Sequence, residues 1–418
     1  MLKKQTCIVL VGLVSLITQV FAGDLLLVGK TDKPSALYEP GEKMVFSVRF
    51  EDGGKAVVGK KLIWNRTGDD GKSDKGEAAS GEQPLQIVTS SDKPGFVKIV
   101  VSALDEAGKV IEVGTDKQKR KVMFEGGAGV QPEKLVSCPE PKDFDAFWAK
   151  QKAELAKVPV KAKMTEVPSK NPKFVVYDVK VDCAGGKPVS GYLVKPKDAA
   201  PKSLKAQVNF MGYGVNSANP SYADETVTLS INAHGIENGK EPEFYENLKK
   251  GEFKGYAFNN TENSNPETAY FRGMMLRVMR ALEFIKSQPV WNGKDLTASG
   301  GSQGGLQSLT AAGLDKDVTK CLAFKPWCCD LGGINMGRLR GWCPDYTAGL
   351  EYFDPVNHAK RIKAETSITA GLGDYVCPPS GISVLYNNIQ AAKKLEYIQG
   401  STHGYNPPNP STHSISSK

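Results

Sequence analysis

From about residue 138 onward, the sequence alternates short apolar runs typical of β-strands with segments that have a helical period. Two helices are predicted most clearly, over residues 143–155 and 270–287, because each places its apolar side chains on one face. Strands are predicted at residues 174–179, 191–194, 206–210, 227–232, 296–299, 320–324 and 367–371. Strands that alternate with helices usually form a parallel sheet, so we expect an α/β domain whose mostly parallel sheet has helices on both faces.

Residues 23–125 have a different pattern, in which short β-rich runs are separated by turn residues and no helical period occurs. The runs lie at residues 25–28, 44–48, 61–64, 84–88, 95–101 and 121–124. This spacing predicts an all-β, immunoglobulin-like sandwich in front of the α/β domain. We expect it to serve as a spacer or lid, and carbohydrate binding is the alternative.

Two details of this first domain give specific expectations. Trp64 lies in a central predicted strand, so we expect its side chain to fill the core, with a sugar-binding platform as the alternative. The run Gly-Gly-Ala-Gly at residues 126–129 is typical of a flexible link. We therefore assign a linker to residues 126–137 and the second domain to residues 138–418.

The first 22 residues have the layout of a secretory signal peptide. Lys3 and Lys4 precede an uncharged run over residues 7–21, which ends at the small residue Ala22. A membrane anchor is the weaker interpretation, because the run is shorter than the roughly 18 apolar residues that a spanning helix needs. We expect cleavage after Ala22 and a secreted or periplasmic protein with no membrane contact afterwards.

Composition and charge exclude several classes of protein. With 40% hydrophobic and 24% charged residues, the 418-residue chain is neither disordered nor a membrane bundle. Removal of residues 1–22, which contain two lysines and no acid, lowers the formal net charge from +8 to +6. This excess is spread along the chain, whereas proteins that bind nucleic acid concentrate basic residues on one stripe. We expect no nucleic-acid partner, and the oligomeric state stays open.

The cysteines do not predict a metal site. Seven of the eight follow the signal peptide, and none belongs to a CxxC pair or to a Cys/His set with zinc spacing. An odd number leaves at least one thiol unpaired or paired between molecules, and the connectivity stays open. The adjacent Cys328 and Cys329 are expected in the core.

A catalytic motif stands where a predicted strand meets a predicted helix. The sequence Gly300-Gly301-Ser302-Gln303-Gly304 has the G-x-S-x-G pattern and precedes a helix predicted over residues 305–314. A serine on so sharp a turn needs a strained backbone, and glycines two residues before and after it let neighbouring backbone pass close. The start of the helix also offers N–H groups to a developing oxyanion.

Partners for this serine follow in the order that α/β-hydrolases use. Asp374 comes after the predicted strand at 367–371, and His403 lies in a polar loop near the C-terminal end of the sequence. We expect neutral His403 to take the proton of Ser302, and Asp374 to hold its tautomer and stabilise the imidazolium. His358 and His413 are expected on the surface.

The oxyanion hole needs two backbone N–H donors. One should come from Gln303, which follows the nucleophile, and the other from the loop after an early strand, where Tyr213 lies between Gly212 and Gly214.

Several motifs together resemble the acetyl xylan esterase/cephalosporin-C deacetylase family of carbohydrate esterases. The resemblance covers residues 138 to about 408 and implies an α/β-hydrolase that removes acetyl groups from sugar hydroxyls. It also implies the triad Ser302, Asp374 and His403, an oxyanion hole of the Tyr213 and Gln303 backbones, and no metal or organic cofactor. It is carried by Phe144, Phe147, Trp148, Gly212, Tyr213, Gly214, Gly301, Ser302, Gln303, Gly304, Gly305, Tyr352, Phe353, Asp354, Asn357, Gly373, Asp374, Cys377, Pro378, Pro379, Ser380, His403 and Gly404.

The chain departs from the family pattern at two places. The family usually has Arg-Gly-Gln where this chain has residues 231–235, and Glu after the catalytic histidine where this chain has Gly404. His234 stands in the first of these segments, and we expect it to replace a structural arginine rather than to touch substrate.

These observations predict a secreted serine esterase that removes O-acetyl groups from acetylated xylan, xylo-oligosaccharides or related sugars through an acyl-enzyme. Two alternatives remain: an esterase or peptidase of the same fold that acts on another bond, and a catalytically silent glycan-binding protein.

Overall fold

Parallel strands occupy the middle of a large sheet and antiparallel strands its edges. The computed structural model describes residues 25–115 and 118–417, so the predicted signal peptide lies outside the described residues. The strands from β16 to β20 pair in parallel, and antiparallel pairs flank them on both sides. Across the sheet the order is β12 (Ala162–Val167), β13 (Phe174–Val181), β14 (Val189–Pro196), β16 (Thr226–Ile231), β15 (Leu204–Phe210), β17 (Trp291–Gly301), β18 (Lys320–Phe324), β19 (Glu365–Gly371), β20 (Lys393–Ile398) and β21 (Thr412–Ser417).

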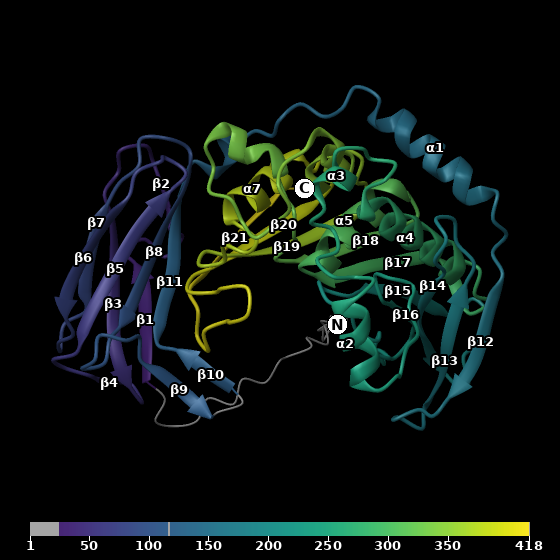
Figure 1. The fold of residues 1–418 in the computed structure, drawn as a ribbon, viewed down its shortest axis with the longest axis horizontal. Helices are drawn as coiled ribbons and strands as arrows, with labels where there is room; N and C mark the ends of the chain where they lie inside the picture. Colours follow the sequence, from purple (N-terminus) through teal and green to yellow (C-terminus); the bar gives the residue numbers. More distant parts are fainter. Residues whose placement is uncertain (1–24, 116–117, 418) are drawn as a thin grey trace, which may run out of the picture.

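Helices cover this sheet on one face, so the expectation of helices on both faces is wrong for the described residues. The helices α4, α5 and α7 contact the strands and, through α6, one another in a single layer (Figure 1). Side chains that alternate onto the other side of β17 and β19, such as Thr297, Ser299 and Ser367, are partly exposed. The reason lies in the connections, because β15 leads to β16 through a loop and β20 is followed by β21. The helices are α1 (Phe144–Ala156), α2 (Pro242–Lys250), α3 (Asn260–Asn263), α4 (Tyr270–Lys286), α5 (Gln303–Leu314), α6 (Pro355–Ala359) and α7 (Pro379–Asn388), with short 3-10 turns η1 (Pro132–Lys134), η2 (Leu331–Met336) and η3 (Ala348–Tyr352).

Two further sheets form the N-terminal region. Their inward side chains belong to one hydrophobic cluster, with Phe46 and Phe50 from one sheet and Ile99 and Val101 from the other. This arrangement agrees with a β-sandwich, and an immunoglobulin-like topology stays a prediction. One sheet contains β1 (Leu25–Thr31), β3 (Met44–Asp52), β4 (Lys55–Ala56) and β7 (Leu85–Thr89); the other has the order β2 (Leu37–Tyr38), β11 (Met123–Val130), β8 (Gly95–Ala103), β5 (Lys61–Gly68) and β6 (Asp74–Ala79); β9 (Glu112–Thr115) and β10 (Gln118–Lys121) form a separate hairpin.

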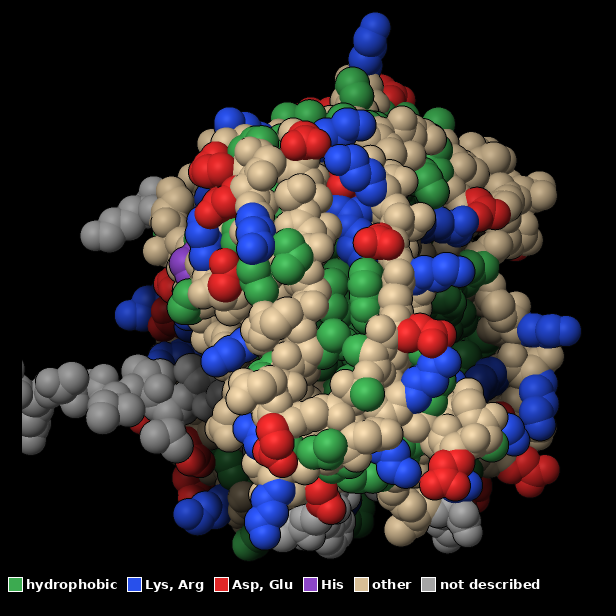
Figure 2. Space-filling model, turned by 90° about the vertical axis from the view of Figure 1, so that its left-hand side faces the viewer, with side chains coloured by type: hydrophobic (Ala, Val, Ile, Leu, Met, Phe, Trp, Pro, Cys, Tyr) green, Lys and Arg blue, Asp and Glu red, His purple; other side chains and the backbone are tan. Residues whose placement is uncertain are grey.

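The surface of this region mixes charges of both signs. Figure 2 shows acidic and basic side chains interspersed on its outer face, with no large patch of one sign. In the part of the chain that the structure describes, no helix has both the length and the apolar character needed to cross a bilayer.

Trp64 packs against the core of the sandwich as expected, but its side chain is only partly buried. Its side chain is half-buried in β5 and packs over Gly76 of the edge strand β6, where a Cβ atom would lie 2.6 Å from the indole ring. The missing side chain of Gly76 makes room for the ring at the sheet edge.

The expected flexible link at residues 126–129 is instead part of β11, which pairs with β8. Its glycines let the strand touch the second region directly: a Cβ at Gly127 would lie 2.7 Å from the carbonyl oxygen of Leu372. The backbone of Gly127 exchanges two hydrogen bonds with the side-chain amide of Gln399, at 3.1 and 2.8 Å. The absence of side chains at these glycines therefore permits close contact between the two regions, and the segment is not a flexible link.

His358 is fully buried, which corrects the expectation that it lies on the surface. It belongs to α6, and its ring packs against Phe144 and Trp148 of α1 at centroid distances of 5.1 and 5.2 Å. Burial is the main cause that lowers the pKa of His358 to about 3, and the positive charge of Arg361 lowers it further. His413 is partly exposed in β21.

The depressed pKa of His358 predicts a pH-dependent stability. Below pH 6.5 the unfolded chain binds a proton that the folded chain does not, so stability falls as pH drops toward 3. At pH 5 this histidine should cost about 2 kcal/mol relative to pH 7. Urea unfolding of the wild type and of His358→Leu at both pH values measures the effect. The variant should lose about 2 kcal/mol less on acidification, and an equal loss in both proteins would contradict the prediction.

Candidate active site

Ser302 lies on a strained turn between β17 and α5, as its motif predicts. Its backbone has φ 55° and ψ −122°, a left-handed conformation that costs energy for a residue with a side chain. Backbone hydrogen bonds hold the turn: the N–H of Ser302 donates to Phe324 (2.9 Å), and its carbonyl accepts from Leu306 (3.1 Å) and Trp327 (3.0 Å).

The glycines of the motif are needed for close backbone approach. A Cβ at Gly300 would lie 2.5 Å from the carbonyl carbon of Gly304, and one at Gly304 would lie 2.2 Å from the carbonyl oxygen of Phe210. The start of α5 thus packs directly on the end of β15, which brings the following loop beside Ser302.

The structure brings Ser302, Asp374 and His403 into one hydrogen-bonded chain. His403 Nε2 lies 3.0 Å from Ser302 Oγ, and His403 Nδ1 lies 2.9 Å from Asp374 Oδ2. The other carboxylate oxygen, Oδ1, accepts from the N–H groups of Val376 and Cys377, each at 3.0 Å. Because Asp374 Oδ2 accepts a hydrogen bond from the Nδ1–H of His403, the tautomer leaves Nε2 free to accept the serine proton. Asp374 is fully buried, and His403 is partly exposed.

Cys377 lies beside this chain. Its sulfur, a carboxylate oxygen of Asp374 and a ring nitrogen of His403 lie within 4.8 Å of one another, the spacing of a possible metal site. Burial raises the pKa of the Cys377 thiol well above its usual range. A protonated thiol is a weak ligand, and the other two groups already bind each other, so the set suits proton transfer better than metal binding.

The two predicted oxyanion-hole residues flank Ser302. Gln303 begins α5, and Tyr213 lies in the loop after β15, where a Cβ at the adjacent Gly212 would be 3.8 Å from the carbonyl oxygen of Gly301. Among the described residues, neither the Tyr213 N–H nor the Gln303 N–H has a backbone or side-chain acceptor. Both donors are therefore available to a ligand.

Tyr256 connects the two sides of this hole. Its hydroxyl accepts from the Gly214 N–H (2.8 Å) and donates to Gln303 Oε1 (3.0 Å). The ring of Tyr213 stacks on the Tyr256 ring at 4.2 Å, and the Tyr213 hydroxyl donates to the Tyr256 carbonyl (3.0 Å). Sequence reasoning missed Tyr256, because it lies in an irregular segment after α2 that carries no motif.

His234 supports the same loop and does not touch the Ser302 chain. Its Nε2–H donates to the carbonyl of Gly214 (3.1 Å), and its Nδ1 accepts from the Tyr270 hydroxyl (2.6 Å). The side chain is 1% exposed, and burial lowers its pKa to about 4, so it is neutral at pH 7. This agrees with the expected structural role.

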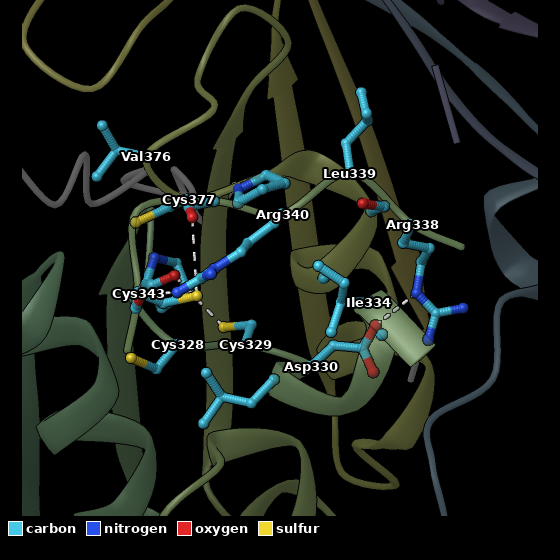
Figure 3. A pocket seen from close by; sticks show the side chains of 17 residues that line it. Cys328, Cys329, Asp330, Ile334, Arg338, Leu339, Arg340, Cys343, Val376 and Cys377 are labelled. Carbon is cyan, nitrogen blue, oxygen red and sulfur yellow. Dashed lines mark hydrogen bonds and ion pairs between the residues drawn. The ribbon is translucent and has the colours of Figure 1, made fainter. Parts of the chain in front are cut away.

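The cysteines near the site are unpaired among the described residues. Cys328 is buried as expected, whereas Cys329 is partly buried, and both line a cavity of about 40 Å³ together with Cys343, Val376 and Cys377 (Figure 3). The cavity lies next to the loop that follows Asp374.

Comparison with known proteins agrees with this geometry. Residues 135–336 and 345–414 match the family model described as acetyl xylan esterase (AXE1). A curated relative, acetyl esterase Axe7A of Xylanibacter ruminicola, is 30% identical over 292 residues, which are 64% of this chain and 64% of that protein. The chain thus spans less than two thirds of that relative's length.

Solved structures show the same fold. An acetyl xylan esterase from Paenibacillus sp. R4 is 27% identical with a TM-score of 0.56, over 65% of this chain and 93% of that one. Acetyl xylan esterase 1 from Thermoanaerobacterium sp. JW/SL YS485 is 22% identical with a TM-score of 0.52, over 65% and 92% of the two chains. The α/β-hydrolase fold expected from the motifs is thereby confirmed, and the chain belongs to the acetyl xylan esterase family.

Proposed function

We propose that this protein is a secreted serine carbohydrate esterase that removes O-acetyl groups from acetylated xylan, xylo-oligosaccharides or related sugars. Family membership supports the reaction class. The observation that carries the mechanism is the hydrogen-bonded chain from Ser302 through His403 to Asp374. The proposed secretion of the protein rests on the predicted signal peptide at residues 1–22 and can be tested independently of the reaction.

In the first half of the reaction, Ser302 Oγ attacks the acetyl carbonyl carbon. The serine proton moves to His403 Nε2, across the 3.0 Å contact, and Asp374 stabilises the resulting imidazolium. The bond between the acetyl carbon and the sugar oxygen then breaks, His403 gives this proton to that oxygen, and the sugar leaves with its hydroxyl restored while the acetyl group stays on Ser302. The left-handed backbone of the turn between β17 and α5 holds the Ser302 hydroxyl at the tip of that turn, where a substrate can reach it.

The negative charge on the tetrahedral intermediate requires fixed donors. The free N–H groups of Tyr213 and Gln303 suit this role, and the N-terminal end of α5 adds a positive field. Gln303 is fully buried, which keeps water from weakening its donor.

In the second half, a water molecule replaces the sugar. His403 takes a proton from the water, which attacks the acetyl carbonyl, and Ser302 recovers its proton as acetate leaves. The sequence of steps needs the same three side chains and no cofactor.

The alternatives differ in what they require of these residues. A glycan-binding protein without activity needs neither the Ser302–His403 bond nor the paired N–H donors to Asp374, so their presence together favours an enzyme. An esterase or peptidase that hydrolyses another bond needs the same hydrogen-bonded Ser302, His403 and Asp374. Only tests with different substrates separate it from the proposed enzyme. For the N-terminal sandwich we propose a spacer or lid role.

The first test is release of acetate from acetylated xylo-oligosaccharides. Ser302→Ala should lower the rate at least about a thousandfold, because the residual activity of such variants comes from binding and the oxyanion hole alone. Wild type that cleaves p-nitrophenyl acetate but releases no acetate from the oligosaccharide would refute the substrate. Equal rates for wild type and variant would refute the serine mechanism.

A second test concerns the bridge that Tyr256 forms. Tyr256→Phe removes the acceptor of the Gly214 N–H and the donor to Gln303, so the oxyanion hole should lose its fixed spacing. We expect kcat for p-nitrophenyl acetate to fall about tenfold with KM changed less than about twofold. Tyr177→Phe, which removes a hydroxyl in β13 at the far side of the sheet, serves as the matched control. A kcat for Tyr256→Phe equal to that of the control would contradict the positioning role.

A further inference from the structure

Residues 337–344, between η2 and η3, lie outside the ranges that match the family model. This segment passes close to the loop after Asp374: the Trp342 N–H donates to the carbonyl of Val376 (3.0 Å). Gly341 permits the approach, because a Cβ there would lie 2.4 Å from the same carbonyl oxygen. The segment is therefore a feature of this chain that touches the active site directly.

The N-terminal sandwich holds the other end of the segment. Asp69, from the turn after β5, accepts the Leu339 N–H at 2.7 Å with Oδ1 and the Phe96 N–H at 2.8 Å with Oδ2. Next to it, Arg338 pairs with the buried carboxylate of Asp330 at 2.6 Å, which is visible in Figure 3. Two regions of the protein thus fix the position of residues 338–342.

At the centre of the segment, Trp342 combines exposure with rigid support. Its side chain is 45% exposed, although most large apolar side chains here are buried. Its ring packs against the rings of Tyr213 (4.8 Å, perpendicular), Phe258 (4.8 Å) and Trp327 (5.6 Å, stacked). Its carbonyl accepts from the Trp327 indole N–H at 2.5 Å.

The neighbours of Trp342 place it at the mouth of the site. Tyr213 lies in the loop after β15 that offers the proposed oxyanion-hole donor. The backbone N–H of Trp327 donates to the carbonyl of Ser302, and the backbone N–H of Val376 donates to Asp374 Oδ1. The exposed indole of Trp342 therefore lies beside residues that contact Ser302 and Asp374.

We propose that the exposed part of Trp342 stacks on a pyranose ring of the xylan chain, next to the acetylated sugar, and that Asp69 holds it in position for this. The proposal rests on the proposed function, because it assigns the sugar-binding surface of the same site. A pyranose ring presents C–H groups on its face, which pack well on an aromatic ring and leave its hydroxyls in water. Arg340 and Asp345, paired at 2.7 Å and half-exposed, form a polar rim that suits those hydroxyls.

Binding of unacetylated xylohexaose tests this without catalysis. Isothermal titration uses the full mature chain with Ser302→Ala, alone and combined with Trp342→Ala, Trp342→Phe or Met164→Ala. Met164 is 39% exposed on the edge strand β12 and controls for removal of an exposed apolar side chain. We expect Trp342→Ala to raise Kd about tenfold, Trp342→Phe to raise it less than about threefold, and Met164→Ala to leave it unchanged. The same Kd for Trp342→Ala and Met164→Ala would overturn the proposal.

The role of Asp69 is tested in the same titration. Asp69→Ala removes both acceptors, whereas Asp69→Asn keeps the shape of the side chain and one acceptor oxygen. We therefore expect Asp69→Ala to raise Kd more than Asp69→Asn does. Thermal unfolding confirms that each variant is folded before titration. If a folded Asp69→Ala protein binds xylohexaose as tightly as the parent, the sandwich does not position Trp342. Acetate release is measured separately, with Ser302 intact. If the protein releases no acetate but binds xylohexaose in a way that depends on Trp342, the esterase reaction is refuted and sugar stacking on Trp342 is supported.

Discussion

The strained backbone of Ser302 is the constraint on which the rest of the site depends. A non-glycine residue in the left-handed region costs roughly 1–3 kcal/mol, and it persists only where the surroundings determine it. Here Gly300 and Gly304 let the strand, the helix and the end of β15 meet without side chains between them. This contact exposes the serine hydroxyl and also brings the Tyr213 loop to the start of α5. The positions of the proposed nucleophile and of the proposed oxyanion-hole loop therefore have one cause.

A second close contact joins the N-terminal sandwich to the loop before Asp374. Glycines in β11 and in the loop before Asp374 replace side chains at the boundary, where a Cβ at Gly373 would lie 2.0 Å from the carbonyl oxygen of Glu125. With Asp69 on the segment that carries Trp342, the sandwich touches two loops that border the site. The N-terminal region is thus in direct contact with loops that border the proposed active site, and β11 is a paired strand where the glycines suggested a flexible link.

The parts that sequence reasoning predicted well are those with strong local signals. The structure brings together Ser302, Asp374 and His403, which the sequence marks by a motif between a periodic strand and helix and by their order, and the parallel strands at the centre of the sheet are marked by apolar runs. The edge strands β12 and β21 are mostly exposed and carry polar residues, so no apolar run marks them. The burial of His358 and the bridge made by Tyr256 depend on contacts between distant segments. A single histidine or tyrosine in the sequence carries no sign of such contacts.

In the proposed mechanism, the acetyl group is carried by Ser302 between the sugar and water. The most direct measurement is rapid mixing of the protein with acetylated xylo-oligosaccharide, acid quenching within one turnover, and peptide mass spectrometry. We expect one acetyl group on the peptide that contains Ser302, which appears with the first released sugar and disappears as acetate forms. Release of acetate at full rate with no acetylated Ser302 peptide at any time would contradict this mechanism.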